Sequence, residues 1–594
     1  MTRRAVLTLA ALAAGLLPAA PAQAAPLDFT VPTYVDQQLG GGEPLVYADP
    51  VHHTLVYTSH EGTTHIYRPG LAGQTTLTFA GGYRNQVNIW TSKDGGLSWQ
   101  RSNFMGTGFT QDPTQNSGFS DPDLSQDDGG RIYNTGINLA SNALFSSSDG
   151  GVTWDQGTPQ CHPGDRPWVV GARKDEVFFA TNALEDTIKQ RVFHSTDGGQ
   201  TCPQEGFQAF GEGWAGNGKM YYDRSRDSLV VPANGSAGLG VATWKRGEDA
   251  FTFRKAVDAN IYAHWAAIIL DDAGGLYLTY DDDPRAAGTE GGCDGSRTPL
   301  PNAVRYVYSP DLGRTWKPPV TVARPAGKRV FWPWLAAGEK GRINIAWYET
   351  SKVVDLACQN ADISVNTATV TGAHTDNPTF VTTDPIGRPI SLNTNICQSG
   401  TTCVATGEDR RLGDFFTNAI DESGCVMIAT GDTHSADPVT GQQRPISLPL
   451  FSRQISGPPL RGGGDCSGRE ANLGLPGVGS TNVVTVGGGV GSSNASTSTR
   501  SGALPPCFSR RRFRIRLRAP KGDRLTRATI YVNGKKRRTL RGKALRRSRV
   551  DLLGLPRGQF TVTIQVRTKK GKKLRQVRKY RTCVKRKRLP ANSG

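Results

Sequence analysis

Short apolar runs separated by polar turns recur along most of this chain. Seven segments share one pattern, in which an apolar run, a turn rich in Asp and Gly, and a second apolar run follow one another. They are PLVYADPVHHTLVYTS, PDLSQDDGGRIYNTG, PWVVGARKDEVFFAT, KMYYDRSRDSLVVPA, AAIILDDAGGLYLTY, PWLAAGEKGRINIAWY and FFTNAIDESGCVMIAT. Short apolar runs bounded by Gly, Asp and Asn are typical of strands, and no helical periodicity interrupts them. The pattern predicts an all-β body between Pro44 and Arg453.

A second motif, Ser-x-Asp-x-Gly-x-x-Trp, marks the turns that follow several of these units. It occurs at residues 92–99, 147–154 and 309–316, at 195–202 with Cys in place of Trp, and in a degenerate form at 243–253. The Ser and Asp side chains can hydrogen-bond turn amides, Gly supplies a positive φ, and Trp packs beside the sheet. We therefore expect the motif itself to be structural.

Three or four strands repeated about seven times predict a β-propeller. The turn motif resembles the Asp-box, or BNR repeat, of sialidases and other secreted propellers, over roughly residues 43–456. The resemblance implies a propeller with these turns on the rim of one face and a site at the centre of the opposite face. Sialidases have six blades and this chain has seven units, so both six and seven blades stay open. Residues 29–37 are expected to add the outer strand of the last blade.

The resemblance also indicates which residues surround the central site. Strand starts contribute Glu43, Asp121, Asp123, Asp165, Arg166, Lys219, His264, Arg410, Arg411 and Asp414. Loops after the second strands contribute His60, Glu61, His65, Asp281, Asp282, Asp283, Arg285, Tyr348 and Glu349.

Sialidase chemistry, as the family implies it, needs an arginine clamp on the substrate carboxylate, a Tyr nucleophile with a Glu base, and an Asp acid. The resulting candidates are Arg166, Arg285 and Arg410 or Arg411 for the clamp, Tyr348 as nucleophile, Glu61 or Glu43 as its base, and Asp121 or Asp165 as acid, with His60 and Asp414 as further substrate contacts. The Phe/Tyr-Arg-Ile/Leu-Pro stretch of sialidases has no copy here, and the nearest sequence is DRPW at 165–168. Whether the protein is an enzyme therefore stays open.

Several of these residues also have a purely structural interpretation. Arg410 and Arg411 can pair with Asp409 and Asp414, and tryptophans 168, 265, 332 and 334 are expected to pack between blades. No cofactor or zinc site is predicted, and calcium at Asp281–Asp283 is the alternative.

The first 24 residues have the features of a signal peptide. Arg3 and Arg4 precede an apolar run, and Ala22-Gln23-Ala24 provides a cleavage site. Twin-arginine and Sec export both stay open. The ten cysteines then favour disulfides over metal ligation. Expected pairs are Cys507 with Cys583, Cys397 with Cys403, and Cys293 with Cys358.

Charge divides the chain into two parts of opposite sign. From Cys507 onward, 32 Lys and Arg face two Asp, a net charge of +30, whereas the preceding part has 38 basic and 49 acidic residues, a net charge of −11. The expected organisation is a signal peptide (1–24), an Asp-box propeller (25–456), a Gly/Ser/Thr-rich linker (457–506) and a basic immunoglobulin-like β-sandwich (507–594). The alternation in RRFRIRLRAP and GQFTVTIQVRT, and the turns at Asn533-Gly534 and Gly571, support strands in the last part.

The sequence thus predicts a secreted or cell-surface protein with no transmembrane segment. One hypothesis is an exo-sialidase-type glycoside hydrolase acting on extracellular glycans. The other is a non-catalytic propeller that binds glycan or protein. In either, the basic domain is expected to attract anionic cell-envelope polymers rather than a specific nucleic acid.

Overall fold

Every regular element of the described residues is a β-strand, as the turn and strand patterns predict. The computed structural model describes residues 26–61, 87–104, 118, 120–138, 141–155, 161–183, 186–201, 203–236, 238–259, 261, 266–283, 299–356, 359–397, 400, 403, 408–434, 444–463, 466, 513–516, 524–541, 549–552 and 558–582. The chain divides into two compact units, Met1–Ser480 and Thr481–Gly594. Within the described ranges, no helix has the length and apolar character needed to cross a membrane.

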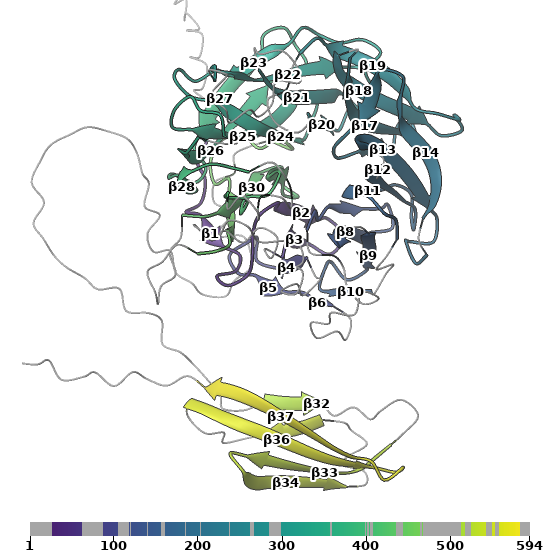
Figure 1. The fold of residues 1–594 in the computed structure, drawn as a ribbon, viewed down its shortest axis with the longest axis vertical. Helices are drawn as coiled ribbons and strands as arrows, with labels where there is room; N and C mark the ends of the chain where they lie inside the picture. Colours follow the sequence, from purple (N-terminus) through teal and green to yellow (C-terminus); the bar gives the residue numbers. More distant parts are fainter. Residues whose placement is uncertain are drawn as a thin grey trace, which may run out of the picture. The chain divides into compact units, whose positions relative to one another are not determined.

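The N-terminal unit is a ring of antiparallel sheets that follow one another around a common centre (Figure 1). The first sheet contains β2 (Leu45–Asp49), β3 (Thr54–Ser59), β4 (Asn88–Ser92) and β5 (Gln100–Arg101). The next contains β7 (Leu124–Gln126), β8 (Ile132–Asn138) and β9 (Ser141–Ser147), beside the parallel pair β6 (Asn103–Phe104) and β10 (Thr153–Trp154).

A longer sheet then spans two of the repeated units. Its first part is β11 (Asp165–Gly171), β12 (Val177–Ala183), β13 (Asp186–Ser195) and β14 (Gln204–Gly211). The short β15 (Trp214–Gly216) links it to β16 (Tyr221–Asp223), β17 (Ser228–Gly235), β18 (Gly238–Lys245) and β19 (Thr252–Val257). Because β15 pairs with both β14 and β17, the two units are joined by backbone hydrogen bonds.

Three further sheets complete the ring. They contain β20 (Ala267–Leu270), β21 (Leu276–Asp282), β22 (Ala303–Ser309) and β23 (Val320–Ala323); then β24 (Val330–Ala337), β25 (Arg342–Thr350), β26 (Ala361–Thr371), β27 (Thr379–Thr383) and β28 (Ser391–Thr394); and last β29 (Thr417–Ile420), β30 (Val426–Asp432), β31 (Leu448–Arg453) and β1 (Thr33–Tyr34). Thr33 pairs with Phe451 and Tyr34 with Leu450, so the predicted closing strand from residues 29–37 is confirmed.

The Ser-x-Asp-x-Gly-x-x-Trp turns make the hydrogen bonds that their residue types predict. In the first copy, Ser92 Oγ donates to Asp94 Oδ1 at 2.7 Å and accepts from the Gly96 amide at 2.8 Å, while φ of Gly96 is +92°. The copies that begin at Ser147, Ser195 and Ser309 repeat both contacts. The first Trp closes the ring, because the Trp99 indole packs edge-on against Tyr57 and Phe451, on the first and last sheets.

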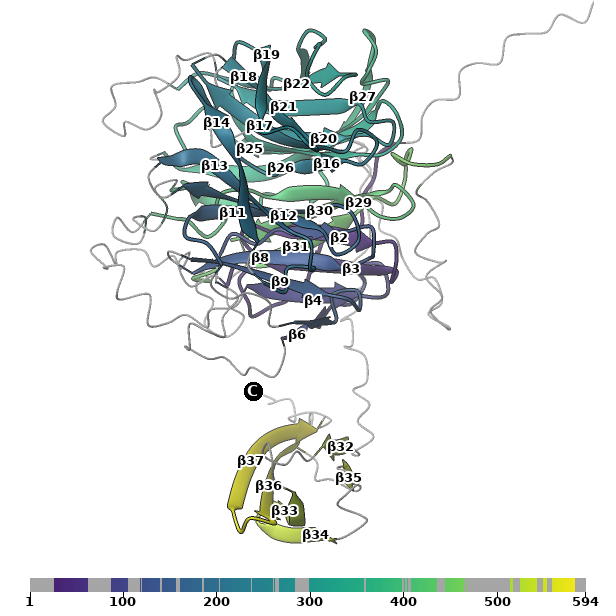
Figure 2. The same cartoon turned by 90° about the vertical axis from the view of Figure 1, so that its right-hand side faces the viewer.

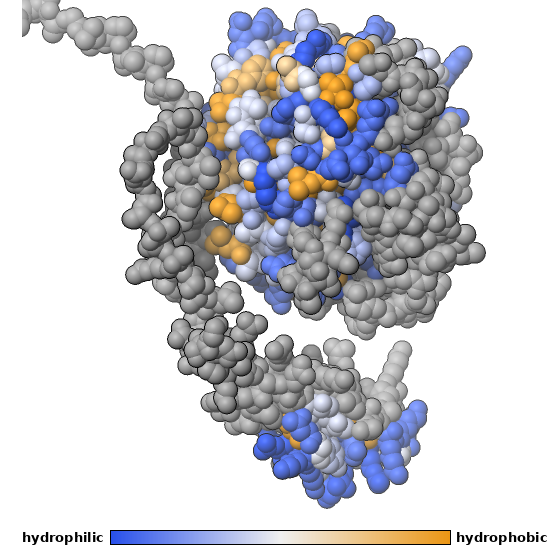
Figure 3. Space-filling model, turned by 60° about the vertical axis from the view of Figure 1, so that its left-hand side comes forward, coloured by the Kyte–Doolittle hydropathy of each residue, from blue (hydrophilic) through white to orange (hydrophobic). Residues whose placement is uncertain are grey.

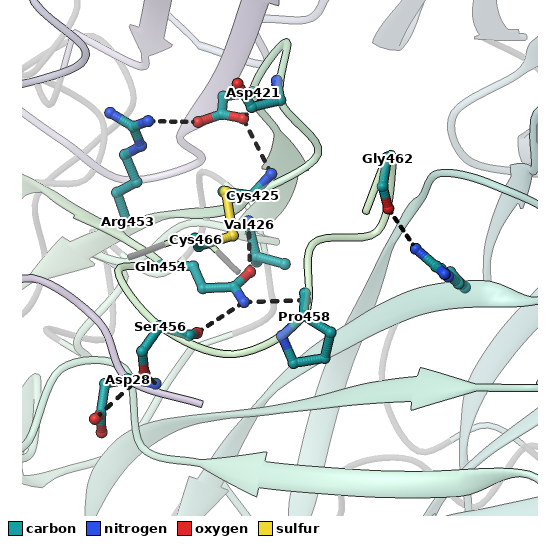
Figure 4. The surroundings of a disulfide bond; sticks show 12 residues. Asp28, Asp421, Cys425, Val426, Arg453, Gln454, Ser456, Pro458, Gly462 and Cys466 are labelled. Atoms are coloured by element: carbon teal, nitrogen blue, oxygen red, sulfur yellow. Dashed lines mark hydrogen bonds and ion pairs between the residues drawn. A yellow bond between two sulfur atoms is a disulfide. The ribbon is translucent and has the colours of Figure 1, made fainter. Parts of the chain in front are cut away.

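The segment after the last strand, residues 454–463 and Cys466, which we call the C-terminal strap, turns back onto the ring (Figure 4). Gln454 Nε2 donates to the carbonyls of Ser456 and Pro458 at 2.9 and 3.1 Å, and the Gly462 carbonyl accepts from Arg342. The disulfide between Cys425 and Cys466 fastens the end of the strap to the turn before β30. Nothing in the sequence alone predicts this pair.

The predicted Cys397–Cys403 disulfide is confirmed. The other two expected pairs, Cys507 with Cys583 and Cys293 with Cys358, lie outside the described residues. So do the predicted signal peptide and most of the predicted linker.

The C-terminal unit contains a curved four-stranded antiparallel sheet (Figure 2). Its order is β34 (Lys535–Arg541), β33 (Leu525–Val532), β36 (Gly558–Thr568) and β37 (Lys573–Thr582), and β32 (Phe513–Arg516) pairs with β35 (Arg549–Leu552). Asn533 and Gly534 both have positive φ, +48° and +77°, which confirms the predicted hairpin turn.

Candidate functional site

The first strand of each repeated unit faces the centre of the N-terminal unit. Together these strands enclose a central cavity of about 360 Å³, lined from successive strands by Tyr47, Gln126, Gly171, Tyr222, Ile269, Leu335 and Asn418, among others. The residues that begin the strands converge at one end of the centre of the ring, and we call that end the mouth. Glu43, Asp121, Arg166 and Asp414 lie at the mouth and do not line the cavity, whose lining instead includes Pro50, Asp421 and Glu422 beyond the opposite ends of the strands.

Four of these strand starts share an unusual backbone conformation. Glu43, Asp121, Arg166 and Trp332 have φ between +51° and +53°, and each directly precedes a proline. A non-glycine residue in the left-handed region costs about 1–2 kcal/mol. The same costly conformation recurs where side chains of the mouth are positioned, and three of the four residues carry charge.

Glu43 is the hub of the mouth and is completely buried. Its Oε2 accepts hydrogen bonds from Ser120 Oγ at 3.0 Å and from the Asp121 amide at 3.1 Å. Its Oε1 accepts from the Asp414 amide at 3.2 Å. One carboxyl group thus connects segments from three different units. We call Glu43, Asp121 and Asp414 the carboxyl cluster.

Two arginines stand beside the carboxyl cluster. Arg410 approaches Asp414 Oδ1 at 2.7 Å, and Arg166 approaches Asp414 Oδ2 at 3.5 Å. The backbone amide of Arg166 also donates to Asp121 Oδ2 at 3.2 Å. The Arg166 side chain is 19% exposed and that of Arg410 is 9% exposed, so Arg166 is the more open to solvent.

Burial and crowding change the titration of two carboxyls. Burial, together with the charge of Asp414, raises the pKa of Glu43 to about 7, although Arg410 opposes the shift. Burial also raises the pKa of Asp121 well above its usual range, and Glu43, Asp165 and Asp414 add to the effect. Both groups are therefore able to hold a proton at a pH where an ordinary carboxyl has lost it.

An aromatic floor of Trp168, Trp334 and Phe415 lies beneath the cluster. Their ring centroids lie 5.5 to 6.2 Å apart, and all three side chains are buried. Trp168 and Phe415 also line a narrow depression, too tight in this structure to hold a water molecule, whose other walls include Glu43, Asp121, Arg166 and Asp414. These tryptophans, like Trp332, pack in the interior as expected, and Trp265 lies outside the described residues.

Tyr348 does not lie at the mouth, which corrects its prediction as nucleophile. Its ring is fully buried and stacks on Phe416 with centroids 4.0 Å apart, and its hydroxyl contacts Thr430 Oγ1 at 2.8 Å. Burial raises the pKa of the phenol, so the phenolate that a nucleophile requires is disfavoured. Tyr348 is a core residue.

Arg411 belongs to the protein interior rather than to a substrate clamp. Its guanidinium makes a two-pronged contact with Asp409 at 2.9 and 2.6 Å and donates to the Arg444 carbonyl. The structural interpretation of the Arg410-Arg411 pair, with Asp414 and Asp409 as partners, is confirmed.

His60 and Glu61 are also more buried than a substrate contact requires. His60 is fully buried with Nε2 3.3 Å from the Arg411 carbonyl oxygen, and burial lowers its pKa to about 3, so the ring is neutral. Glu61 is 8% exposed and does not line the depression. Asp165 is partly exposed at the start of β11, next to Arg166.

The remaining predicted residues divide into three groups. Asp123 pairs with Lys219 at 2.5 Å, and Glu349 pairs with Lys328 at 2.6 Å. Arg285, His65 and His264 lie outside the described residues. Of the residues proposed for calcium, Asp282 pairs with Arg305 at 2.9 Å and Asp283 with Arg329 at 2.8 Å. In the described part of the chain, no group of three or more His, Cys, Asp or Glu side chains is placed to hold a metal ion.

The structure thus brings together Asp121, Arg166, Arg410 and Asp414 from the predicted set. It gives Glu43, predicted only as an alternative base, the central place. The sequence signal for this was the recurrence of a polar or aromatic residue before proline at strand starts, at 43–44, 121–122, 166–167 and 332–333.

No protein-family model matches the chain, and no curated protein matches it. Solved structures similar to it include the phage phi92 endosialidase, with 10% identity over 96% of this chain and 90% of that chain, and a TM-score of 0.38. A protein of unknown function from Dyadobacter fermentans has 12% identity over 74% and 99% of the two chains, with a TM-score of 0.35. The α-L-arabinofuranosidase Arb93A from Fusarium graminearum has 14% identity over 72% and 97%, with a TM-score of 0.34.

Proposed function

We propose that this protein is a secreted, glycan-acting β-propeller whose carboxyl cluster cleaves a glycosidic bond. Each of the seven repeated sequence units contributes a set of consecutive strands to the ring, and β1 completes the last set, which supports seven blades rather than six. The observation that carries the functional proposal is the group of three carboxyls and two arginines at the mouth.

Glycosidases commonly use two carboxyl groups, one protonated to donate to the leaving oxygen and one ionised. Asp121 is partly exposed and has a raised pKa, so it is our candidate for the acid. Glu43 lies behind it and raises its pKa through charge. Asp414 lines the same depression, and Asp165 directly precedes Arg166 at the start of β11, so these two are the candidates for the ionised partner.

The catalytic residues in this proposal differ from those of a sialidase in one respect. Because Tyr348 is a core residue, the nucleophile or base would be a carboxylate. Arg166 is the candidate to orient an acidic sugar, since its partly exposed guanidinium lines the depression. An exo-acting enzyme on sialic acid or another acidic sugar is therefore the narrower form of the proposal.

A non-catalytic, glycan- or protein-binding propeller is the second candidate. The observation that favours it is the hydrogen bonding of Glu43, which accepts from Ser120, Asp121 and Asp414. Such contacts hold neighbouring units together and would be useful without catalysis. In both forms we propose a secreted or cell-surface protein, with the basic C-terminal unit as an immunoglobulin-like module that binds anionic polymers of the cell envelope.

The test is turnover on a panel of fluorogenic glycosides that includes a sialoside and uronides. We expect wild-type protein to cleave at least one, and Arg166→Ala to lose most of that activity. Arg173→Ala is the matched control, because Arg173 follows the opposite end of β11 and pairs with Asp227 on the surface. Absence of turnover on every substrate would favour the binding propeller.

A further inference from the structure

The four-stranded sheet of the C-terminal unit has one apolar and one polar face. Ala528, Ile530, Leu540, Val562 and Ile564 are buried. Ala528 pairs with Leu540, and Ile530 with Ile564, so these side chains share a face. Because side chains alternate along a strand, the residues between them point to the other face.

Four cationic residues stand in one transverse row on that second face. Arg541 on β34 pairs with Arg527 on β33, Arg527 pairs with Arg567 on β36, and Arg567 pairs with Lys573 on β37. Arg541, Arg567 and Lys573 are exposed and Arg527 is partly exposed. We call these four residues the cationic row. With neighbouring strands about 4.8 Å apart, the row spans about 14 Å.

This arrangement is unfavourable for the unit by itself. Like charges directly opposite each other on neighbouring strands destabilise a sheet, and the row contains three such pairs. Among the described residues of the unit, the single acidic residue is Asp551, on β35 of the other sheet. The adjacent transverse row contains Thr539, Thr529 and Gln565 in register, and its position on β37 is Arg575, so it has one cationic residue where the cationic row has four. A ligand with regularly spaced negative charges would relieve the repulsion.

We propose that the cationic row binds a linear polyphosphodiester laid across the four strands. Three of the four residues are arginines, whose planar guanidinium forms two parallel hydrogen bonds with a phosphate. The inference gives a location to the envelope attachment proposed above, and it does not depend on glycan cleavage.

Two other anionic partners fit the surface less well. A lipid surface is attracted by the number of cations near it rather than by their register, and attachment is strengthened by apolar side chains that insert. Large exposed apolar side chains of the described residues all belong to the N-terminal unit, and the visible described surface of the C-terminal unit is mostly hydrophilic (Figure 3). Single-stranded nucleic acid binding relies on aromatic stacking platforms, and the row has no aromatic residue.

The experiment compares two full-length variants that lose the same charge. Arg527→Gln/Arg567→Gln removes the centre of the row. Lys535→Gln/Arg537→Gln removes two exposed cations of β34. This strand also carries Arg541, but Lys535 and Arg537 lie outside the row. Binding to labelled poly(glycerol phosphate) is measured by fluorescence anisotropy at about 0.15 M salt, where long-range attraction is screened.

We expect the row variant to bind about tenfold more weakly and the control variant to change less than about twofold, because charge-assisted contacts depend on register. Unfolding of the row variant should occur at the same or a higher temperature than in wild type, since repulsion is removed. Equal losses in both variants, no binding by wild type, or tighter binding to single-stranded DNA or to phosphatidylglycerol vesicles would overturn the proposal.

Glycoside turnover measured on the same row variant separates this proposal from the catalytic one. We expect the row variant to match wild type in turnover, because its substitutions lie in the C-terminal unit. A wild-type protein that binds the polymer but cleaves no glycoside would disprove only the catalytic proposal.

Discussion

Carboxyl groups at the rim turns and at the mouth of the ring behave in opposite ways. At the rim, burial of Asp94 is slight, and hydrogen bonds from Ser98 and Ser92 outweigh it, so its pKa is lowered. Asp149, Asp197 and Asp311 follow the same rule in the other copies of the turn. At the mouth, burial and neighbouring carboxyls raise the pKa of Glu43 and Asp121.

The direction of the pKa shift separates carboxyl groups that stabilise the fold from carboxyl groups that we expect to take part in proton transfer. The ionised form of a rim aspartate is favoured, because its carboxylate accepts hydrogen bonds from the hydroxyl and amide groups of the turn. Glu43 and Asp121 at the mouth are kept where ionisation is unfavourable, an arrangement frequent at sites of proton transfer. The repeated Ser-x-Asp-x-Gly turns therefore identify the architecture, while the charged residues at the strand starts identify the candidate site.

The largest expected effect is on catalysis. Asp121→Asn and Glu43→Gln should lower turnover of the cleaved glycoside by about 10²–10⁴-fold, because each removes a carboxyl that donates a proton or tunes the donor. The rim counterpart Asp94→Asn should leave turnover near that of wild type. Steady-state kinetics on all three variants measures these changes. Equal activity in the mouth and rim variants would show that the mouth carboxyls have no catalytic role.

The pH dependence of stability should differ between the two regions. Between its unfolded pKa near 4.5 and its folded pKa of about 7, Glu43 holds a proton in the folded state that the unfolded chain has lost. The unfolding free energy should therefore fall as pH rises through this window, by up to about 3 kcal/mol. Rim aspartates, with lowered pKa values, are ionised in both states there and add no slope.

Denaturant unfolding of wild type and Glu43→Gln between these pH values measures the slope. The variant should show a flatter profile, because glutamine does not titrate. A profile as steep in the variant as in wild type would assign the slope to other groups.

Trp99→Ala should reduce stability without reaching the mouth. The indole joins the first and last sheets through Tyr57 and Phe451. It is only partly buried, so we expect a loss of about 2 kcal/mol, below the usual cost of truncating a fully buried tryptophan. Calorimetry gives the change in Tm, and the kcat of any detected turnover at a temperature where the variant is folded should be unchanged.

The smallest effect is expected from the rim carboxylate itself. Asp94→Asn keeps the side-chain shape but removes charge from contacts with Ser92 and Ser98. We expect a loss of about 1 kcal/mol, the net contribution of such a hydrogen bond. Urea unfolding at neutral pH measures it, and a loss comparable to that of Trp99→Ala would give the turn a larger role than we assign to it.

Features built from local sequence were predictable. The strand pairs and the rim turns with Ser92 and Gly96 follow from alternation and turn chemistry. The closing strand at Thr33–Tyr34 pairs with distant Phe451 and Leu450, and ring closure in a propeller, rather than local sequence, predicts it. The Cys397–Cys403 disulfide joins cysteines at a sequence separation of 6, so its partners are close in the chain. Repetition made the order of the sheets readable as well.

Features built from long-range packing were not. Tyr348 lies in a strand whose sequence pattern leaves either face open, and its packing against Phe331, Trp332 and Phe416 decides that it is buried. Cys425 and Cys466 are 41 residues apart, and sequence alone does not select that pair. Glu43 gains its importance from Ser120 and Asp414, which are distant in the chain.

The most direct test of this account is the protonation state of Glu43 and Asp121. Infrared difference spectra during a pH titration detect the carbonyl stretch of a protonated carboxyl group. At about pH 6, above the pKa of an ordinary carboxyl, wild type should retain this band, and Glu43→Gln and Asp121→Asn should each reduce it while Asp94→Asn leaves it intact. A wild-type spectrum without the band at that pH, or one that Asp94→Asn alone reduces, would contradict the account.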